Sequence, residues 1–353
     1  MVKKNKNTLR SINWEKEKKR WEGMKHVFTE PAPEVGLTPR KAIWKKNKAA
    51  LWYYEAPEKK YNVPLFLVYS LVNQPFILDL APGMSMIEAF INEGFDVYLL
   101  DFGIPGYEDK DITIDDYVYD YIQKAVKKSL RHSGADEVTV IGYCLGGTLA
   151  AMYAAIAEEP IKNLILSVAP IDFSSPPVYD EWVKQLRHGT IEYEKILDMY
   201  GTIPARFIEA GMRIASYPIY FSHYASLLQR ADDKEYVEKW RRFNLWTKNH
   251  IPFSGAALKQ LITDLGKDNK LMNGNLMLRQ KQANLSNITA NLLVVSTTFD
   301  TLVPSQMSAS VIDAVSSADK TFKMVDGGHA TLAANGELPD FLAEWLPQRS
   351  EPI

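Results

Sequence analysis

A single cysteine stands between two glycines in the segment Gly142-Tyr143-Cys144-Leu145-Gly146. It follows a β-branched run at residues 138–141 and precedes an alanine-rich stretch that predicts a helix over residues 145–157. A sharp turn from strand to helix holds its central residue in strained backbone geometry, and glycines let the neighbouring backbone pass closely. A lone cysteine is more often a small buried side chain. In this context, however, the pattern indicates that Cys144 is a nucleophile.

Two further residues could complete a catalytic triad with Cys144. Asp300 comes just after the apolar strand predicted over residues 291–296, and His329 just after the strand predicted over 321–325. Sites of open α/β sheets lie at the carboxyl edge of the strands, so both side chains are expected there. The chain order of nucleophile, acid and histidine is that of the α/β-hydrolase fold, with cysteine in place of serine. We therefore predict Cys144, Asp300 and His329 as catalytic residues.

The other acids and histidines of the chain fit this triad less well. Asp172 also follows a predicted strand, over residues 164–168, and stays open as an alternative acid. Asp326 is close to His329 in sequence, and a carboxylate so near in the chain rarely points at the imidazole ring with the right geometry. The other five histidines have no strand-end placement. One cysteine and scattered histidines match no ligand spacing, so no metal site is predicted.

A thiol nucleophile favours one kind of chemistry. Attack of a thiolate on a thioester gives another thioester, so the acyl group stays activated for a second acceptor, and a paired histidine generates the thiolate. This points to acyl transfer from a coenzyme A or carrier thioester, with no cofactor needed because coenzyme A is a product. The backbone N–H of Leu145 is the predicted oxyanion donor. A second donor is expected from the loop at Val72 to Gln74.

The elements that must position these residues alternate between strand and helix from about residue 61. This alternation predicts a doubly wound, mostly parallel sheet in residues 61–174 and 286–353. Residues 175–285 are helical, aromatic and methionine-rich, which predicts an inserted helical cap over the site. Residues 1–60 are predicted to be a polar, helical segment packed on the core, with an amphipathic helix from Thr8 to Phe28. The predicted core elements are strands at 64–69, 96–100, 138–143, 164–168, 291–296 and 321–325, and helices at 85–92, 114–130 and 145–157.

Composition excludes several function classes. The chain has 353 residues and a net charge of −2, which gives no nucleic-acid footprint. No apolar run approaches the roughly 18 residues of a membrane span, so no transmembrane segment is expected. The first residues are charged without an apolar signal core, and a free catalytic thiol suits a reducing cytosol. We expect a cytoplasmic protein.

Taken together, these segments resemble the polyhydroxyalkanoate synthases. The resemblance is to the short catalytic subunits of the two-subunit kinds, class III and class IV, and the length and lysine-rich style look most like the Bacillus-type class IV subunit. The matching segments are Gly36-Leu37-Thr38-Pro39, residues 71–80, Asp101-Phe102-Gly103, residues 142–148, Trp246, Pro252-Phe253, Asn269-Lys270-Leu271, Asp300 with Val303-Pro304, and Gly327-Gly328-His329.

The resemblance implies polymerisation of (R)-3-hydroxyacyl-CoA, such as 3-hydroxybutyryl-CoA, into a polyester with release of CoA. It also implies a small accessory subunit and a place at the surface of polyester granules in the cytoplasm; the cap and the basic N-terminal helix are both open as docking surfaces. Two departures from the family pattern are Thr301, where many members have His, and Asn249, where many have Asp. Two other functions stay open: a hydrolase of the same fold, either an acyl-CoA thioesterase or a polyester depolymerase, and a non-catalytic granule-associated protein.

Overall fold

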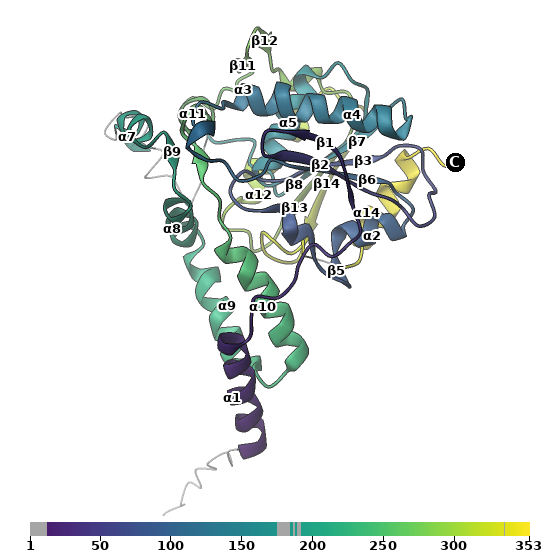
Figure 1. Ribbon diagram of the computed structural model, residues 1–353. Helices are drawn as coiled ribbons and strands as arrows, with labels where there is room; N and C mark the ends of the chain where they lie inside the picture. Colours follow the sequence, from purple (N-terminus) through teal and green to yellow (C-terminus); the bar gives the residue numbers. More distant parts are fainter. Residues whose placement is uncertain (1–12, 175–183, 186–187, 189–191, 335) are drawn as a thin grey trace, which may run out of the picture. The chain divides into compact units, whose positions relative to one another are not determined.

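The computed structural model describes residues 13–174, 184–185, 188, 192–334 and 336–353 (Figure 1). The chain forms two compact units. One consists of Met1–Pro33 with Tyr217–Leu245, and we call it the helical unit. The other consists of Glu34–Ser216 with Trp246–Ile353, and we call it the sheet unit.

The sheet unit is built on eight strands in the order β1-β2-β6-β3-β7-β8-β13-β14. The pairs β1–β2 and β2–β6 are antiparallel, and every pair from β6 to β14 is parallel. The predicted doubly wound, mostly parallel sheet is confirmed. The strands are β1 (Lys41–Lys46), β2 (Ala49–Tyr54), β3 (Leu65–Val68), β6 (Val97–Asp101), β7 (Val138–Tyr143), β8 (Ile161–Ser167), β13 (Asn291–Thr297) and β14 (Lys320–Val325).

Helices cover both faces of this sheet, with α4 and α5 on one face and α2 and α14 on the other (Figure 1). The longer helices of the sheet unit are α2 (Met86–Asn92), α4 (Lys124–Ser133), α5 (Leu145–Ile156), α7 (Tyr193–Tyr200), α8 (Ala205–Ala215), α11 (Gly255–Gln260) and α14 (Asp340–Trp345). Short helical pieces are η1 (Pro75–Leu78), η2 (Tyr107–Asp109), α3 (Ile114–Asp116), η3 (Tyr117–Gln123), η4 (Leu261–Lys267), η5 (Leu285–Asn287), α12 (Ser305–Ala309), α13 (Val311–Ala314) and η6 (Pro347–Arg349). Two-residue and three-residue strands form the pairs β4 (Asp79–Ala81) with β5 (Met84–Ser85), β9 (Thr202–Ile203) with β10 (Phe253–Ser254), and β11 (Met277–Leu278) with β12 (Lys281–Gln282).

The central strands and helices can be predicted from the sequence because they are buried. Every residue of β7 is buried, as expected for a parallel strand covered on both faces. Helix α5 is apolar on all sides, and nearly all of its residues are buried, which is typical of a core helix. The helix predicted over residues 114–130 is present, but it includes the π-helical segment η3 and continues to Ser133.

Two parts of the predicted domain division differ from the structure. Residues 41–54 form strands β1 and β2, not a helical segment, because β1 is an edge strand whose exposed lysines hide its pattern. The predicted cap at residues 175–285 is split between the two units: residues 217–245 belong to the helical unit, and Phe253 and Leu265 lie in the core of the sheet unit. Residues 175–183 of the predicted cap, with Trp182, lie outside the described residues.

The helical unit contains α1 (Trp14–Thr29), α9 (Tyr217–Arg230) and most of α10 (Lys234–Lys248). Its small core consists of Leu227, Val237 and Trp240, against which Met24 and Val27 of α1 pack. The predicted helix over residues 8–28 is present from Trp14 onward, while its part at residues 8–12 lies outside the described residues. Since Met24 and Val27 of α1 pack against α9 and α10, α1 belongs with these helices and not with the sheet, contrary to our expectation.

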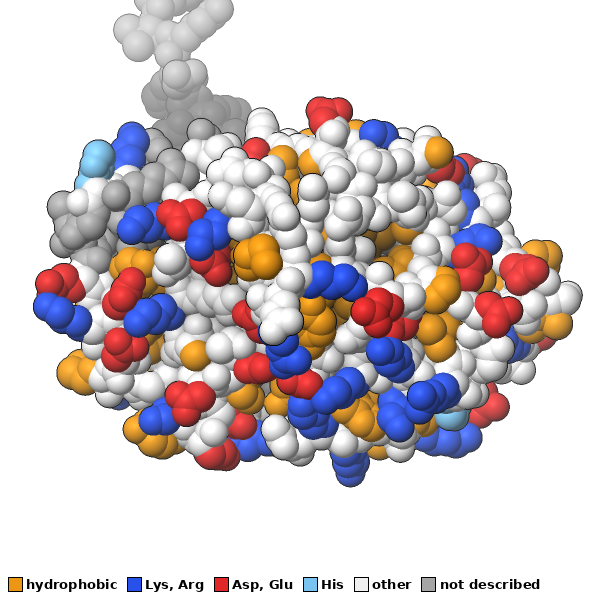
Figure 2. Space-filling view, turned by 90° about the horizontal axis from the view of Figure 1, so that it is seen from above, with side chains coloured by type: hydrophobic (Ala, Val, Ile, Leu, Met, Phe, Trp, Pro, Cys, Tyr) orange, Lys and Arg blue, Asp and Glu red, His pale blue; other side chains and the backbone are white. Residues whose placement is uncertain are grey.

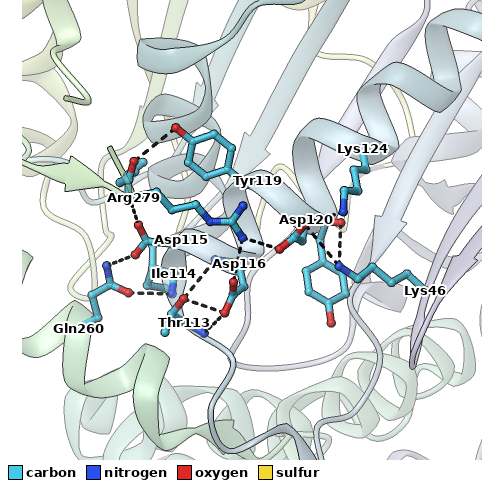
Figure 3. Close-up of polar contacts among 12 residues, drawn as sticks. Lys46, Thr113, Ile114, Asp115, Asp116, Tyr119, Asp120, Lys124, Gln260 and Arg279 are labelled. Carbon is cyan, nitrogen blue, oxygen red and sulfur yellow. Dashed lines mark hydrogen bonds and ion pairs between the residues drawn. The ribbon is translucent and has the colours of Figure 1, made fainter. Parts of the chain in front are cut away.

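A polar network ties the β11–β12 hairpin to the helical segments α3 and η3 (Figure 3). The Arg279 guanidinium contacts the carboxylates of Asp116 at 3.0 Å and Asp120 at 2.5 Å, and the backbone N–H of Arg279 donates to Asp115. Asp120 also binds Lys124 at 2.6 Å. Burial alone would raise the pKa of Asp120, but the hydrogen bonds from Lys124 and Arg279 lower it to about 2.

This network predicts an acid-sensitive contribution to stability. A folded-state pKa of Asp120 below its usual value means that the pairing stabilises the fold above about pH 4, and that this stabilisation is lost as the pH falls toward 2. Arg279→Met should therefore lower the free energy of unfolding at pH 7 by about 1 kcal/mol, because Arg279 is half exposed and water screens the pairs. The difference from the wild type should shrink steadily in urea titrations between about pH 4 and pH 2. The matched control is Arg131→Met, since exposed Arg131 has no ion pair within the described residues; an equal loss there would contradict the prediction.

The surface of the described residues carries both signs of charge. In the view from above, Lys and Arg side chains alternate with Asp and Glu, and hydrophobic side chains form small separate patches between them (Figure 2). Among the described residues, no helix combines the length and apolar character needed to cross a membrane.

Candidate active site

Cys144 occupies a strained turn between β7 and α5. Its backbone φ is 54° and ψ is −130°, so this non-glycine residue has a positive φ at the N-terminus of the helix. Such geometry costs roughly 1–3 kcal/mol and is found mostly at functional sites. The flanking glycines are required by packing: a Cβ on Gly142 would lie 2.4 Å from the Cα of Gly147, and one on Gly146 would lie 2.3 Å from the carbonyl oxygen of Val68.

Asp300 and His329 come together at the carboxyl edge of the sheet. The Asp300 side chain is completely buried. Its Oδ1 accepts hydrogen bonds from the backbone N–H groups of Leu302 and Val303, both at 2.9 Å, and its Oδ2 lies 2.7 Å from Nδ1 of His329. The carboxylate is thus held by its own loop, and it fixes the proton of His329 on Nδ1.

The ring of His329 also forms a hydrogen bond with the side chain of Cys144. Burial lowers the pKa of His329, but the negative charge of Cys144 and the hydrogen bonds to Asp300 and Cys144 outweigh it and raise that pKa to about 10. The protonated form of the His329 imidazole is therefore favoured at neutral pH. The arrangement can hold a thiolate–imidazolium pair, oriented from behind by Asp300.

The alternative acids have other partners. Asp172 Oδ1 accepts from the backbone N–H of Ser174 and from Nδ2 of Asn269, both at 2.9 Å. Asp326 Oδ1 accepts from the hydroxyl of Thr298 at 2.8 Å. The structure thus brings Asp300, and neither of these carboxylates, against His329.

The two predicted oxyanion donors differ in their surroundings. Leu145 is the first residue of α5, where backbone N–H groups have no partner inside the helix; its N–H makes no hydrogen bond among the residues that the structure describes. The N–H of Val72, in contrast, donates to the hydroxyl of Ser70 at 3.3 Å. The Val72 carbonyl accepts from the N–H of Ile251 at 3.1 Å, so part of the predicted cap borders this loop.

Tyr69 is a neighbour of Cys144 that the sequence analysis did not single out. It follows β3 directly and is buried, its hydroxyl donates to Oδ1 of Asn73 at 3.4 Å, and Trp246 is another neighbour of that hydroxyl. Burial and, next, the charge of Cys144 raise the pKa of Tyr69 well above its usual value. Its position at a strand end of the same sheet edge was the signal that could have found it.

No cluster of metal-binding side chains accompanies this site. Across the described part of the chain, no three His, Cys, Asp or Glu side chains gather closely enough to hold a metal ion.

The chain is similar to known proteins at two levels, a fold class and a family within it. A family model for the alpha/beta hydrolase fold matches residues 64–334, so the chain belongs to the α/β-hydrolase fold proteins. Within them, the chain belongs to the family of poly(3-hydroxyalkanoate) polymerase subunit PhaC. The resemblance to polyhydroxyalkanoate synthases is confirmed, while the assignment to class III or class IV stays a prediction.

Three relatives with that name illustrate the match. The subunit from Haloferax mediterranei is 33% identical, over 90% of this chain and 65% of its own length. That from Haloarcula marismortui is 31% identical, over 90% of this chain and 69% of its own length. That from Allochromatium vinosum is 29% identical, over 93% of this chain and 94% of its own length. The chain thus spans just under two thirds of the Haloferax relative and nearly all of the Allochromatium one.

Proposed function

We propose that this chain is the catalytic subunit of a poly(3-hydroxyalkanoate) polymerase, an acyltransferase that moves 3-hydroxyacyl groups from CoA to a growing polyester. The observation that carries the proposal is Cys144 in a strained turn, hydrogen-bonded to a His329 that Asp300 orients, in a member of the PhaC family. A thiol nucleophile keeps the acyl group activated between donor and acceptor, which hydrolysis does not require.

The proposed first step is acylation of Cys144. His329 takes the thiol proton, and the thiolate attacks the thioester carbon of 3-hydroxyacyl-CoA. The N–H of Leu145 stabilises the developing oxyanion, since it points from a helix N-terminus and has no other partner among the described residues. Val72 becomes the second donor if its N–H leaves the Ser70 hydroxyl. The carbon–sulfur bond of the donor then breaks, and CoA leaves with the proton from His329.

The proposed second step is elongation. The 3-hydroxyl of another acyl unit attacks the acyl thioester on Cys144, and His329, oriented by Asp300, takes the hydroxyl proton. A new ester bond forms, the bond to the Cys144 sulfur breaks, and the sulfur receives the proton. The net reaction joins two hydroxyacyl units and releases one CoA for each unit added.

Product analysis with 3-hydroxybutyryl-CoA tests this proposal directly. The purified chain, alone and with its candidate second subunit, should release CoA and convert the acyl groups into solvent-extractable polyester. Release of CoA with only free 3-hydroxybutyrate as product would show a hydrolase instead. No CoA release under either condition would show a non-catalytic protein.

We further propose that the active form is a complex with a smaller accessory subunit, working at the surface of polyester granules in the cytoplasm. The named relatives are each a polymerase "subunit", which supports a multi-component enzyme. Co-expression with the candidate accessory subunit should yield a co-purifying complex and raise the specific rate of CoA release by about tenfold or more, because a partner that prefers the substrate-accepting state shifts the population toward it. Full activity of the lone chain, with no gain from a partner, would contradict this prediction.

A further inference from the structure

The outer face of α1 exposes three large aromatic side chains in one line. Trp14, Trp21 and Phe28 are 77%, 75% and 76% exposed. They are spaced seven residues apart, so they lie on one side of the helix. The side that packs within the helical unit carries Gly23, where a Cβ would lie 1.8 Å from the carbonyl oxygen of Ala231, and is flanked by Met24 and Val27. Isolated exposed hydrophobic residues are common, but an aligned set of this size marks an interaction site.

Two lysines complete this line. Lys18 and Lys25 each follow a tryptophan by four residues, so they project from the same side of α1 between the aromatic rings. Both are exposed, and neither forms an ion pair within the described residues. Glu17, which borders the line, is bound to Arg20 at 2.7 Å. We call this set (Trp14, Lys18, Trp21, Lys25 and Phe28) the α1 stripe.

We propose that the α1 stripe binds an amphipathic helix with acidic flanks that belongs to the accessory subunit. The seven-residue spacing identifies a helical partner, because residues repeated every seven positions stay in contact only with a helix that winds around the first. The unpaired positive charges of Lys18 and Lys25 call for Glu or Asp beside the apolar seam of that helix. A second copy of α1 fits poorly, since it would bring the lysines of both chains into one seam.

This inference rests on the proposed function only for the identity of the partner. The chemistry of the stripe can be tested without it, using a fluorescent three-heptad peptide with Leu at a and d and Glu at e and g. Fluorescence anisotropy with the full chain should show binding with a Kd of about 10 µM or lower. A peptide of the same pattern with Lys at e and g should bind about tenfold more weakly or not at all.

Variants of the full chain assign the binding to the stripe. Trp21→Ala should weaken binding of the acidic peptide about tenfold, since exposed aromatic anchors dominate such contacts. The double variant Lys18→Glu with Lys25→Glu should reverse the preference and favour the Lys peptide. Phe322→Ala is the matched control, because Phe322 is an exposed aromatic side chain on edge strand β14, and binding should not change.

Several results would overturn the inference. They are no binding of the acidic peptide, equal binding of both peptides, or an unchanged preference in the double lysine variant. Self-association of the wild type that Trp21→Ala abolishes would identify a second copy as the occupant. Partition of the chain into anionic lipid vesicles without peptide binding would identify a lipid surface. Binding of the peptide only after removal of residues 1–12 would identify that segment of the chain itself.

A second experiment uses the accessory subunit itself. Trp21→Ala should abolish the gain in CoA release from the accessory subunit but leave the basal rate of the lone chain unchanged. A complex that forms and activates equally in this variant would overturn the stripe as the docking site. If no subunit activates the chain while the peptide experiments succeed, the stripe stands and the proposed complex fails.

Discussion

Replacement of Cys144 by alanine should abolish CoA release from 3-hydroxybutyryl-CoA and leave the fold intact. The Cβ of alanine keeps the turn between β7 and α5, but no atom remains to form the acyl thioester. Cys144→Ser should lose activity by orders of magnitude, because a hydroxyl is far harder to ionise than a thiol. CoA release can be followed with a thiol reagent, and circular dichroism verifies the fold. Half of the wild-type turnover in either variant would mean that Cys144 is not the nucleophile.

Substitution of His329 by glutamine should abolish both acylation and elongation, since one imidazole serves both proton transfers. Asp300→Asn should have a smaller effect on acylation than on elongation, where a hydroxyl must be activated. The cause is geometric: Asp300 accepts from two backbone N–H groups with one oxygen and from His329 with the other. The asparagine side chain must turn its NH2 group either toward the backbone N–H groups or toward the ring, and both are donors. If the NH2 group faces the ring, the ring proton can no longer stay on Nδ1. A loss of roughly 10³-fold in elongation is expected from the wrong tautomer.

Single-turnover acylation and steady-state polymerisation separate these two steps. The control is Asp172→Asn, which should change neither step, because that carboxylate binds Ser174 and Asn269. Should Asp172→Asn be as damaging as Asp300→Asn, or should Asp300→Asn impair acylation more than elongation, the roles assigned here would be wrong.

The core of the fold could be predicted because its pattern is local. Strands such as β7 are covered on both faces, and therefore read as continuous β-branched and apolar runs. The turn at Cys144 could be predicted because one of its glycines is required by a contact within a few residues of chain, that of Gly142 with Gly147. Strand ends then placed Asp300 and His329 at one sheet edge, and the structure joins them.

What could not be predicted depends on contacts between distant segments. The edge strand β1 carries lysines on its exposed side, so its sequence resembles a solvated helix more than a strand. The membership of residues 217–245 in the helical unit follows from the packing of Met24 and Val27 on Leu227 and Trp240, about 200 positions away. The same holds for Tyr69 and Trp246, which are neighbours although no local pattern connects their segments.

The backbone at Cys144 has a consequence for any effort to make this protein more robust. A residue with φ of 54° is held there by the rest of the fold, and glycine at that position would relieve the strain. Selection for thermal stability alone would thus favour loss of the side chain that the proposed reaction requires. At this position stability and the proposed activity therefore place opposite demands on the residue. Substitutions meant to stabilise the enzyme should be made at other positions.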